Sequence, residues 1–446
     1  MKKFLLSFSL AISFAAHAQI WTEKATGFAA PGRSLYTISI VDPNVIWANA
    51  FDNSVPLSPV NSIKEFTLSI DGGNTWTPGT ITLVEDNTGV ELDISSITAV
   101  SLTTAWISAA PLTGAVNGGI WQTTDGGVTW NKQTTALFNN PTESYTNFVH
   151  FWDAINGIAG GDPEGGEFEI YTTTDGGANW TRVPGANLPD PVPAGNEFGF
   201  FNRQFVLGDT IWFGTDTGRI YKSIDKGLNW TVTQSPSTNF VYDRITFSDA
   251  NKGLLLIYDN TSPSLYNTTD GGTTWNLVTT TGLLATTDIA YIPGTSTVVS
   301  GNAANPTNSA YSLDNGVTWT SIDNKLHGMT VFLNDSFGFS SGSSTSATVG
   351  GVYKYSVIPL SAPSFDSKRN ILAYPNPTNG ILKLNSDNSL IKEASVFDLA
   401  GKQVYNSKFS SLNTVDLDLK PLETGLYLLK VTSESGKTET MKIMKN

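Results

Sequence analysis

An eight-residue pattern, Ser/Thr-x-Asp-x-Gly-x-x-Trp, occurs six times in this chain and constrains its fold more than any other feature. The copies are SIDGGNTW at 69, TTDGGVTW at 123, TTDGGANW at 173, SIDKGLNW at 223, TTDGGTTW at 268 and SLDNGVTW at 312. Successive aspartates are separated by 54, 50, 50, 45 and 44 residues. Self-similarity at a nearly fixed period indicates a repeat architecture.

Each copy of the pattern has the chemistry of a hairpin turn. An aspartate accepts hydrogen bonds from backbone N–H groups of its own turn, glycine adopts a positive φ, and tryptophan packs beneath the loop. A short strand with an aromatic residue precedes most copies, as in Gly119-Ile120-Trp121. We therefore assign structural roles to the residues Asp71, Asp125, Asp175, Asp225, Asp270, Asp314, Trp76, Trp130, Trp180, Trp230, Trp275 and Trp319.

Two more strand-like runs lie upstream of each turn, which gives four strands per unit of about 45 residues, the arithmetic of a propeller blade. A seventh unit, 329–355, keeps three strands but has no such turn and no tryptophan strand. The missing strand is predicted at 20–24, where Ile-Trp-Thr-Glu-Lys is similar to the segments that follow the turns. We expect seven blades, with residues 20–26 pairing with 351–356; a six-bladed ring with extra strands is the alternative.

The turns resemble the Asp-box, or BNR, repeat found in propellers of sialidases, xyloglucan-cleaving glycosidases, sortilin-type receptors and photosystem II assembly factors. The resemblance covers one hairpin per repeat and implies an all-β fold, an Asp-box β-propeller. It does not extend to sialidase chemistry, which needs three converging arginines, a tyrosine nucleophile with a glutamate partner and an Arg-Ile-Pro motif. The propeller region has five arginines in other contexts: Arg33, Arg182, Arg203, Arg219 and Arg244.

The N-terminus has the form of a secretory signal peptide over residues 1–18. Lys2 and Lys3 precede an apolar stretch, and the small-residue ending Ala-Ala-His-Ala precedes Gln19. A buried N-terminal helix is the alternative interpretation. No later apolar run is long enough for a transmembrane helix, so none is expected in the mature chain. The chain contains no cysteine, which excludes disulfides, thiolate nucleophiles and Cys-based zinc sites.

Charge changes sign near residue 367. Residues 19–367 hold 13 Lys+Arg and 31 Asp+Glu, a net charge of −18, whereas residues 368–446 hold 11 and 8, a net charge of +3. Such a step indicates a domain boundary. An acidic body repels phosphate backbones, so nucleic acid is not expected as a partner. We expect a propeller over 19–356, a linker over 357–370 and a C-terminal domain over 371–446.

The C-terminal region shows the alternation of a small antiparallel β-sandwich. Three motifs, Tyr374-Pro375-Asn376-Pro377, Phe397-Asp398-Leu399-x-Gly401-Lys402 and Glu423-Thr424-Gly425-Leu426-Tyr427, occur in order. In these residues the domain resembles the type A C-terminal sorting domain of type IX secretion cargo. The resemblance implies recognition by the translocon, removal by a sortase near the linker, and a body that is extracellular or on the outer-membrane surface, reached through the periplasm. A carbohydrate-binding β-sandwich is the alternative.

Recognition is expected on the propeller face opposite the Asp-box turns, where loops differ from blade to blade. Carboxylates beside aromatic rings suit sugar binding or acid/base hydrolysis, although solvated loop charges have the same appearance. The candidate residues for a ligand face are Asp162, Glu164, Glu167, Glu197, Asp216, Arg219, Asp259 and Trp152.

The sequence favours a non-enzymatic module that binds a protein or a glycan, with an extracellular glycoside hydrolase using the same carboxylates as the alternative. A third possibility, an assembly factor, rests on the Asp-box alone. No cofactor or metal site is predicted: His150 and His327 fall in different blades, and neither metal-ligand spacing nor a Gly-x-Ser-x-Gly elbow occurs. The catalytic residues, if any exist, are not identified by sequence.

Overall fold

The computed structural model describes residues 20–54, 63–84, 91–112, 114–192, 197–237, 242–258, 263–303, 309–356, 371–386, 389–398, 401–436 and 438–446. The chain divides into two compact units, and the division falls between Ser356 and Ile371. The predicted signal peptide and linker lie outside the described residues. No helix among the described residues is long and apolar enough to cross a membrane.

The first unit is built from groups of four antiparallel strands, which we number as blades. Blade 1 contains β2 (Arg33–Ile40), β3 (Ile46–Asp52), β4 (Glu65–Ser69) and β5 (Thr77–Thr80). Blade 2 contains β6 (Leu92–Ala99), β7 (Ala105–Pro111), β8 (Gly119–Thr123) and β9 (Asn131–Lys132). Blade 3 contains β10 (Thr146–Phe151), β11 (Gly157–Glu164), β12 (Glu167–Thr173) and β13 (Thr181–Arg182).

The remaining groups follow the same plan. Blade 4 contains β14 (Phe205–Leu207), β15 (Thr210–Gly214), β16 (Arg219–Ser223) and β17 (Thr231–Gln234), preceded by a 3-10 turn at Gly185–Asn187. Blade 5 contains β18 (Tyr242–Phe247), β19 (Gly253–Tyr258), β20 (Pro263–Thr268) and β21 (Asn276–Leu277). Blade 6 contains β23 (Asp288–Tyr291), β24 (Val298–Gly301), β25 (Ser309–Ser312) and β26 (Thr318–Asp323), and β22 (Thr281–Gly282) adds in parallel to β26.

Blade 7 joins the two ends of the propeller. It contains β27 (Thr330–Asn334), β28 (Phe337–Ser346) and β29 (Val349–Tyr355), and β1 (Trp21–Ala25) pairs antiparallel with β29 from Trp21↔Tyr355 to Ala25↔Gly351. This pairing confirms the prediction that the N-terminal strand completes the last blade. Blades 7 and 1 meet through the single pair Ser34↔Ser343, so they are two groups within one extended sheet.

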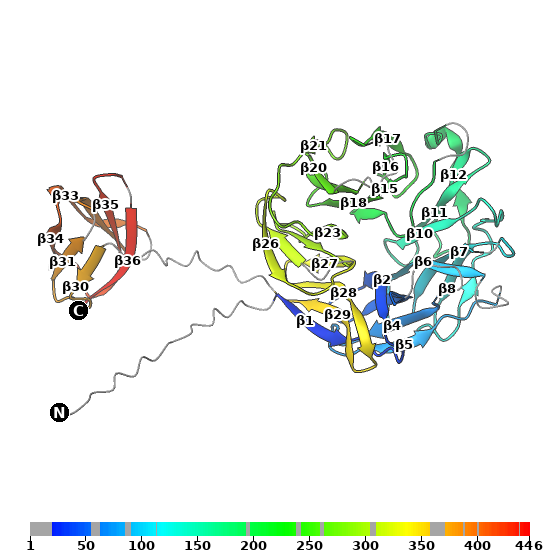
Figure 1. The fold of residues 1–446 in the computed structure, drawn as a ribbon, viewed down its shortest axis with the longest axis horizontal. Helices are drawn as coiled ribbons and strands as arrows, with labels where there is room; N and C mark the ends of the chain where they lie inside the picture. The colour runs from blue at the N-terminus through cyan, green and yellow to red at the C-terminus, as the bar shows by residue number, and fades with distance from the viewer. Residues whose placement is uncertain are drawn as a thin grey trace, which may run out of the picture. The chain divides into compact units, whose positions relative to one another are not determined.

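Figure 1 shows the sheets set around a common centre, with β2, β10, β18, β23 and β27 on the inner side and β5, β17 and β21 at the periphery. The described strands thus form seven four-stranded groups, two of which share one extended sheet. Large apolar clusters fill the spaces between neighbouring groups, such as Trp106, Phe151 and Trp180 between blades 2 and 3. Trp106 and Phe151 stack with ring centroids 3.5 Å apart.

The six Asp-box turns have the predicted chemistry. In the second turn, Asp125 Oδ1 accepts the Thr129 N–H at 2.9 Å and the Thr123 hydroxyl at 2.8 Å, and Oδ2 accepts the Thr129 hydroxyl at 2.6 Å. Gly127 has a φ of 87°, and its N–H donates to the Thr123 hydroxyl oxygen. The other five turns repeat this arrangement, so a hairpin between the third and fourth strands of blades 1 to 6 is confirmed.

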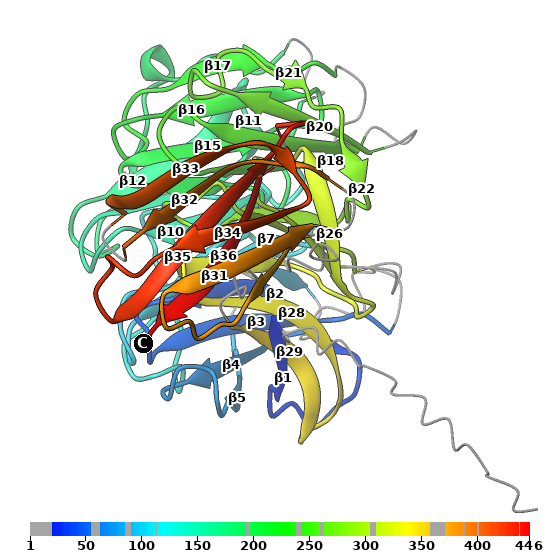
Figure 2. The ribbon, with the colours of Figure 1, turned by 90° about the vertical axis from the view of Figure 1, so that its left-hand side faces the viewer.

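The second unit is a sandwich of two antiparallel sheets (Figure 2). One sheet has the order β30 (Ile371–Tyr374), β31 (Ile381–Ser386), β34 (Thr414–Asp418). The other has the order β33 (Gln403–Leu412), β32 (Ile391–Phe397), β35 (Gly425–Ser433), β36 (Thr438–Lys445). Leu382, Val396, Leu429 and Ile443 lie fully buried between them, as alternation in the sequence predicts.

Trp21 connects the closing strand to the core, and its removal is expected to destabilise the propeller. Its side chain is 2% exposed and contacts the rings of His327, Phe332 and Tyr355. We expect Trp21→Ala to lower the free energy of unfolding of the propeller by about 3–5 kcal/mol. Urea titration followed by tryptophan fluorescence measures this, with Lys24→Ala on the same strand as control. Equal stability of the two variants would contradict the role of β1 in ring closure.

A second expectation concerns acid. The Thr129 hydroxyl and N–H and the Thr123 hydroxyl lower the pKa of Asp125 to about 2, and hydrogen bonds from Thr274 and Thr268 do the same for Asp270. Because these pKa values lie below the unfolded value of about 3.9, the turns contribute stability that is present above pH 4 and is lost as the pH falls towards 2. Circular dichroism across that pH range should show a smaller loss of folded structure in Asp125→Asn than in the wild type. An equal loss in the two proteins would contradict this expectation, because it would mean that the pKa of Asp125 is the same in the folded and unfolded states.

Candidate functional site

Five of the eight predicted ligand-face residues lie in or beside connections opposite the Asp-box turns. In each blade the turns between first and second strands and between third and fourth strands share one face, because all four strands are antiparallel. Glu164 and Glu167 flank the turn between β11 and β12, and Asp216 and Arg219 flank the turn between β15 and β16. Glu197 lies in the connection from blade 3 to blade 4. Asp259 lies outside the described residues.

Glu197 is held on all sides by protein groups. Its fully buried carboxylate accepts the Thr215 hydroxyl at 2.7 Å, the Val192 N–H at 2.7 Å and Arg219 Nη1 at 2.7 Å. Arg219 is 15% exposed and also donates to the Asp190 carbonyl. Because this charge is paired and hydrogen-bonded inside the protein, the predicted Glu197 and Arg219 fix the connection between the blades.

Asp162 and Asp216 come together from neighbouring blades and hold the same connection. Asp162 Oδ1 accepts the Asn147 side-chain N–H at 2.7 Å and the Gly199 N–H at 2.8 Å. Asp216 Oδ1 accepts the Phe198 N–H at 2.9 Å, while the Asp216 N–H donates to the Phe198 carbonyl at 3.0 Å. Burial, aided by the charge of Asp216, raises the pKa of Asp162 to about 7. Burial, with the charge of Glu197, also raises the pKa of Asp216.

These bonds place residues 197–203, which we call the axial loop, across the centre of the ring. Asn202, with a φ of 53°, donates its N–H to the Asn147 carbonyl at 3.1 Å and its side-chain N–H to the Tyr36 carbonyl at 3.0 Å. Arg244 donates to the Asn202 carbonyl at 3.0 Å, and Met329 Sδ lies 3.5 Å from the Asn202 amide nitrogen. One residue thereby contacts blades 1, 3 and 5 and the segment leading into blade 7.

A second set of acidic residues lies around Arg182, beside the β11–β12 turn of blade 3. Arg182 lies 3.6 Å from Glu164 and donates to the Glu164 and Glu167 carbonyls. This pair is about one-third exposed, so its contribution is small. Glu169, which the sequence patterns did not indicate, is fully buried beside it, and burial raises its pKa to about 7. Glu169 lies on the same face of β12 as Tyr171, and no motif in the strand EFEIYTT indicates that it is buried.

Trp152 does not lie on the predicted face. It follows β10 in the turn to β11, at the same end as the Asp-box turns, and its indole N–H donates to the Gly208 carbonyl at 2.8 Å. Lys226, which belongs to an Asp-box turn, lies 5.9 Å from the Trp152 ring centroid. The prediction of Trp152 as a ligand-face residue was therefore wrong, because the turn after a first strand points to the box face.

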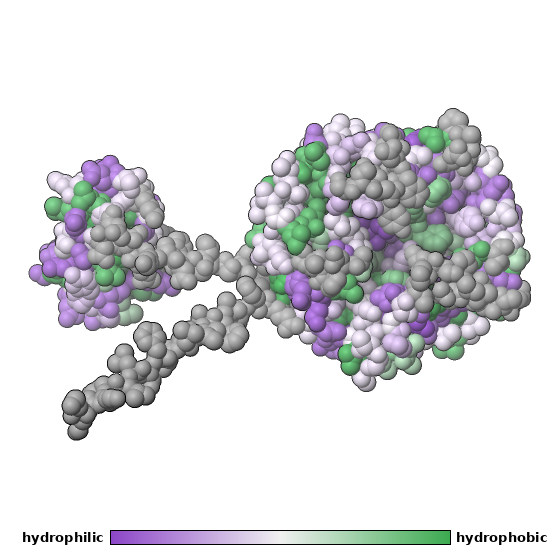
Figure 3. Space-filling view, in the orientation of Figure 1, coloured by the Kyte–Doolittle hydropathy of each residue, from purple (hydrophilic) through white to green (hydrophobic). Residues whose placement is uncertain are grey.

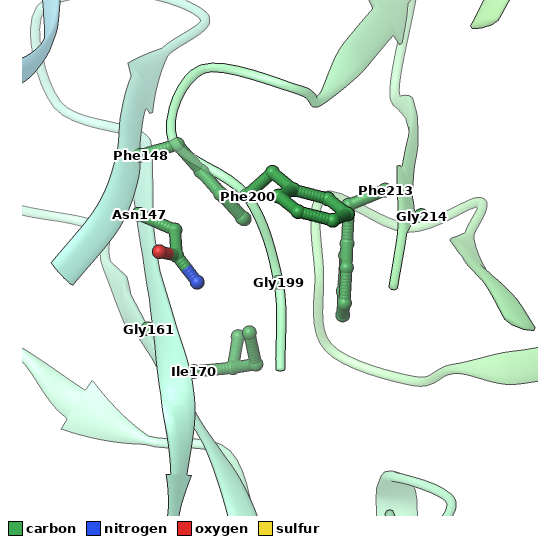
Figure 4. A pocket seen from close by; sticks show the side chains of 8 residues that line it. All are labelled: Asn147, Phe148, Gly161, Ile170, Gly199, Phe200, Phe213 and Gly214. Atoms are coloured by element: carbon green, nitrogen blue, oxygen red, sulfur yellow. The ribbon is translucent and has the colours of Figure 1, made fainter. Parts of the chain in front are cut away.

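The space between β10, β11 and the axial loop is nearly filled. A cavity of about 10 Å³ lies there, room for one water molecule at most, and is lined by Asn147, Phe148, Gly199, Phe200 and Phe213, among others. Figure 4 shows the Asn147 amide directed towards the segment that carries Gly199. The Oδ1 atom of Asn147 has no hydrogen-bond partner among the described residues. In Figure 3, hydrophobic and hydrophilic residues mix near the middle of the propeller face shown.

Besides Arg182, Arg33, Arg219 and Arg244 form ion pairs with acidic residues in the described part of the propeller. Arg33 pairs with Asp52 at 2.7 Å and Glu65 at 2.8 Å, Arg219 pairs with Glu197, and Arg244 pairs with Asp288 at 2.9 Å. Each of these three sets is part of the packing between strands or blades. Within the described ranges, no three His, Asp or Glu side chains are grouped so as to hold a metal ion.

Residues 372–446 match the family described as secretion system C-terminal sorting domain. This match places the protein among exported proteins that are secreted or at the outer-membrane surface. No curated protein matches the sequence.

Solved structures show the same propeller fold. YCF48 bound to D1 peptide is 15% identical with a TM-score of 0.53, covering 76% of this chain and 97% of its own. YCF48 from Cyanidioschyzon merolae is 18% identical with a TM-score of 0.54, covering 76% and 99%. The GH74 xyloglucanase from Xanthomonas campestris is 11% identical with a TM-score of 0.50, covering 95% and 74%. The first unit is therefore a β-propeller, and at these identities the likeness shows the fold alone.

The raised pKa of Asp162 predicts a pH dependence opposite to that of the Asp-box turns. The folded state binds this proton more tightly than the unfolded chain, so the free energy of unfolding falls as the pH rises from about 4 to about 7. We expect Asp162→Asn, which keeps an acceptor oxygen, to reduce that fall by about 2–4 kcal/mol. Glu169 acts in the same direction, so the fall is reduced and not abolished.

Urea titrations at pH 4.5 and 8 measure this effect, with Asp190→Asn as the exposed control. A pH dependence unchanged by Asp162→Asn would contradict the buried state of that carboxyl.

Proposed function

We propose that the propeller is a non-enzymatic binding module whose face opposite the Asp-box turns holds a protein or glycan partner outside the cell. The observation that carries this proposal is the use of the face's carboxylates: Glu197, Asp162 and Asp216 accept N–H and O–H groups that fix the axial loop. These carboxylates therefore anchor the loop. Hydrolysis, by contrast, requires carboxylates that contact a substrate in a cleft.

Two aromatic side chains on this face are partly exposed. Phe198 is 37% exposed and Tyr258, at the end of β19, is 44% exposed. Asp216 bonds both backbone groups of Phe198, accepting its N–H through the side chain and donating its own N–H to the carbonyl. The Phe198 and Phe200 rings form a T-shaped pair with centroids 5.6 Å apart. A rigidly held exposed ring provides contact area at little entropic cost, which suits both protein surfaces and the apolar faces of sugars.

The comparison with YCF48 supports binding as a use of this fold, because one of the similar solved structures is YCF48 bound to D1 peptide. The identity is 15%, so no ligand is transferred from that protein to this chain.

For export, we propose a signal peptide over 1–18, a propeller over 19–356, a linker over 357–370 and a sorting domain over 371–446. In this scheme the translocon recognises the sorting domain and a sortase removes it near the linker, leaving the propeller free or attached at the surface. The match over 372–446 supports the scheme.

A glycoside hydrolase is the second candidate, and one observation favours it. Asp162 has a pKa of about 7 and is influenced by the nearby charge of Asp216, a combination found in acid/base pairs of hydrolases.

Screening the full-length protein on glycan and peptide arrays, with hydrolysis measured on the same glycans, separates the two candidates. We expect a bound ligand whose Kd rises about tenfold or more in Phe198→Ala or Tyr258→Ala, about 1.4 kcal/mol, because the aromatic contact is lost. Val128→Ala, exposed on an Asp-box turn, is the matched control and should bind normally.

Turnover of a glycan that is abolished in both Asp162→Asn and Asp216→Asn, with binding retained, would contradict the binding proposal and establish the hydrolase.

A further inference from the structure

The two edges of the larger sheet in the sorting domain are treated differently. At one edge, β36 is covered by the Tyr374-Pro375-Asn376-Pro377-Thr378 segment. The Asn376 amide donates to the Lys442 carbonyl at 2.8 Å and accepts the Met444 N–H at 2.8 Å. Thr378 continues this pairing, since its N–H donates to the Met444 carbonyl and its carbonyl accepts the Asn446 N–H at 2.9 Å.

This arrangement explains the motif physically. Proline has no N–H, so the chain around Asn376 cannot present a regular strand to β36. The asparagine side chain, with one donor and one acceptor, replaces the missing peptide group. From the Lys442 carbonyl to the Asn446 N–H, the outer backbone groups of the last strand are therefore paired by this segment, while β35 pairs its inner side.

The opposite edge has no such cover. Among the described residues, β33 pairs with β32 and with no other strand. Figure 2 shows β33 beside β32 at the margin of this sheet. The strand is irregular after Lys408, where the register with β32 shifts and Ser411 has a φ of 56°. In Gln403–Lys408, apart from the shift at Val404, the backbone N–H and C=O groups on the side away from β32 have no partner strand in the described part of the domain.

We propose that this edge is the docking site for an extended segment of the export machinery, which adds to β33 as a further strand. The inference goes beyond the proposed role of the propeller and rests on the export role of the sorting domain. Strand addition takes its affinity from main-chain hydrogen bonds, for which an uncovered edge is required. Within the larger sheet, the cap on the last residues of β36 directs such a partner to β33.

The chemistry of β33 indicates the kind of segment that fits. Its exposed side chains Gln403, Asn406, Lys408 and Ser410 carry one positive charge and no negative charge. The same outward face of the sheet carries Lys430 and Lys442 on β35 and β36, and Glu393 on β32 lies opposite Lys408 and accepts the Asn406 side-chain N–H at 2.9 Å. Three lysines against one glutamate leave this face with a net positive charge. A neutral or acidic extended segment is therefore the complementary partner.

Proline substitution tests the proposal, because adjacent residues of a strand point their N–H groups to opposite sides. Of Ser407→Pro and Lys408→Pro, the one whose N–H points away from β32 should keep the melting temperature of the full-length protein. In a host with this secretion system, that variant should accumulate in the periplasm with export reduced at least tenfold. Normal export of the stable proline variant would overturn the proposal.

Lys408→Ala keeps the backbone and removes one of the charges on this face, so its export should fall by much less than that of the stable proline variant. A block as complete as in the proline variant would overturn edge pairing. Deletion of 372–446 should abolish export. If the protein without residues 372–446 is still exported, the export role of the domain is wrong. If that deletion blocks export but the stable proline variant is exported, only the proposal of pairing at the β33 edge is rejected.

Hydrogen exchange is the second measurement, in case both prolines unfold the domain. On the full-length protein, adding purified translocon should slow amide exchange in Gln403–Lys408 and leave Thr438–Lys445 unchanged; equal exchange at β33 with and without the translocon would overturn the proposal. Light scattering tests whether a second copy of this chain occupies the edge. If the wild type is a dimer and the stable proline variant is a monomer, the proposed partner is rejected.

Discussion

Carboxylates that accept main-chain N–H groups hold this propeller at both of its faces. At one face, six aspartates each close a hairpin between the third and fourth strands of a blade, as Asp125 does with Thr129. At the other, Asp162, Asp216 and Glu197 accept the N–H groups of Gly199, Phe198 and Val192 and fix a loop across the axis. The chain has no disulfide, so these bonds and the apolar packing between blades order its loops.

The two sets of carboxylates differ in solvation, and the difference appears in their pKa values. The Asp-box carboxylates are largely solvated and gain hydrogen bonds on folding, so the pKa of Asp125 falls to about 2. Asp162 also gains hydrogen bonds, but burial outweighs them and raises its pKa to about 7. In the Asp-box turns, hydrogen bonds therefore favour the charged form of aspartate, which stabilises the fold. Near the axis, burial makes the charged form of Asp162 unfavourable.

Much of the fold was predictable because its signals are local. The Asp-box turn needs residues within eight positions, and the closing strand was recognised by its similarity to other strands that follow a turn. The axial loop was not predictable, since Asn202 contacts Tyr36 and Met329, which are 166 and 127 positions away. Trp152 was misplaced because an aromatic residue in a turn does not reveal which face the turn lies on. Glu169 was missed because a buried carboxyl in a strand has no motif.

The proposed function depends above all on the carboxylates of the recognition face acting as anchors of the axial loop. Amide hydrogen exchange on the wild type and on Glu197→Ala tests this role most directly. We expect slow exchange at Gly199 and Asn202 in the wild type and at least tenfold faster exchange in the variant, with Gly127 and Thr129 in the Asp-box turn unchanged. Fast exchange of the axial loop in the wild type would leave these carboxylates free for a substrate and would contradict their role as anchors.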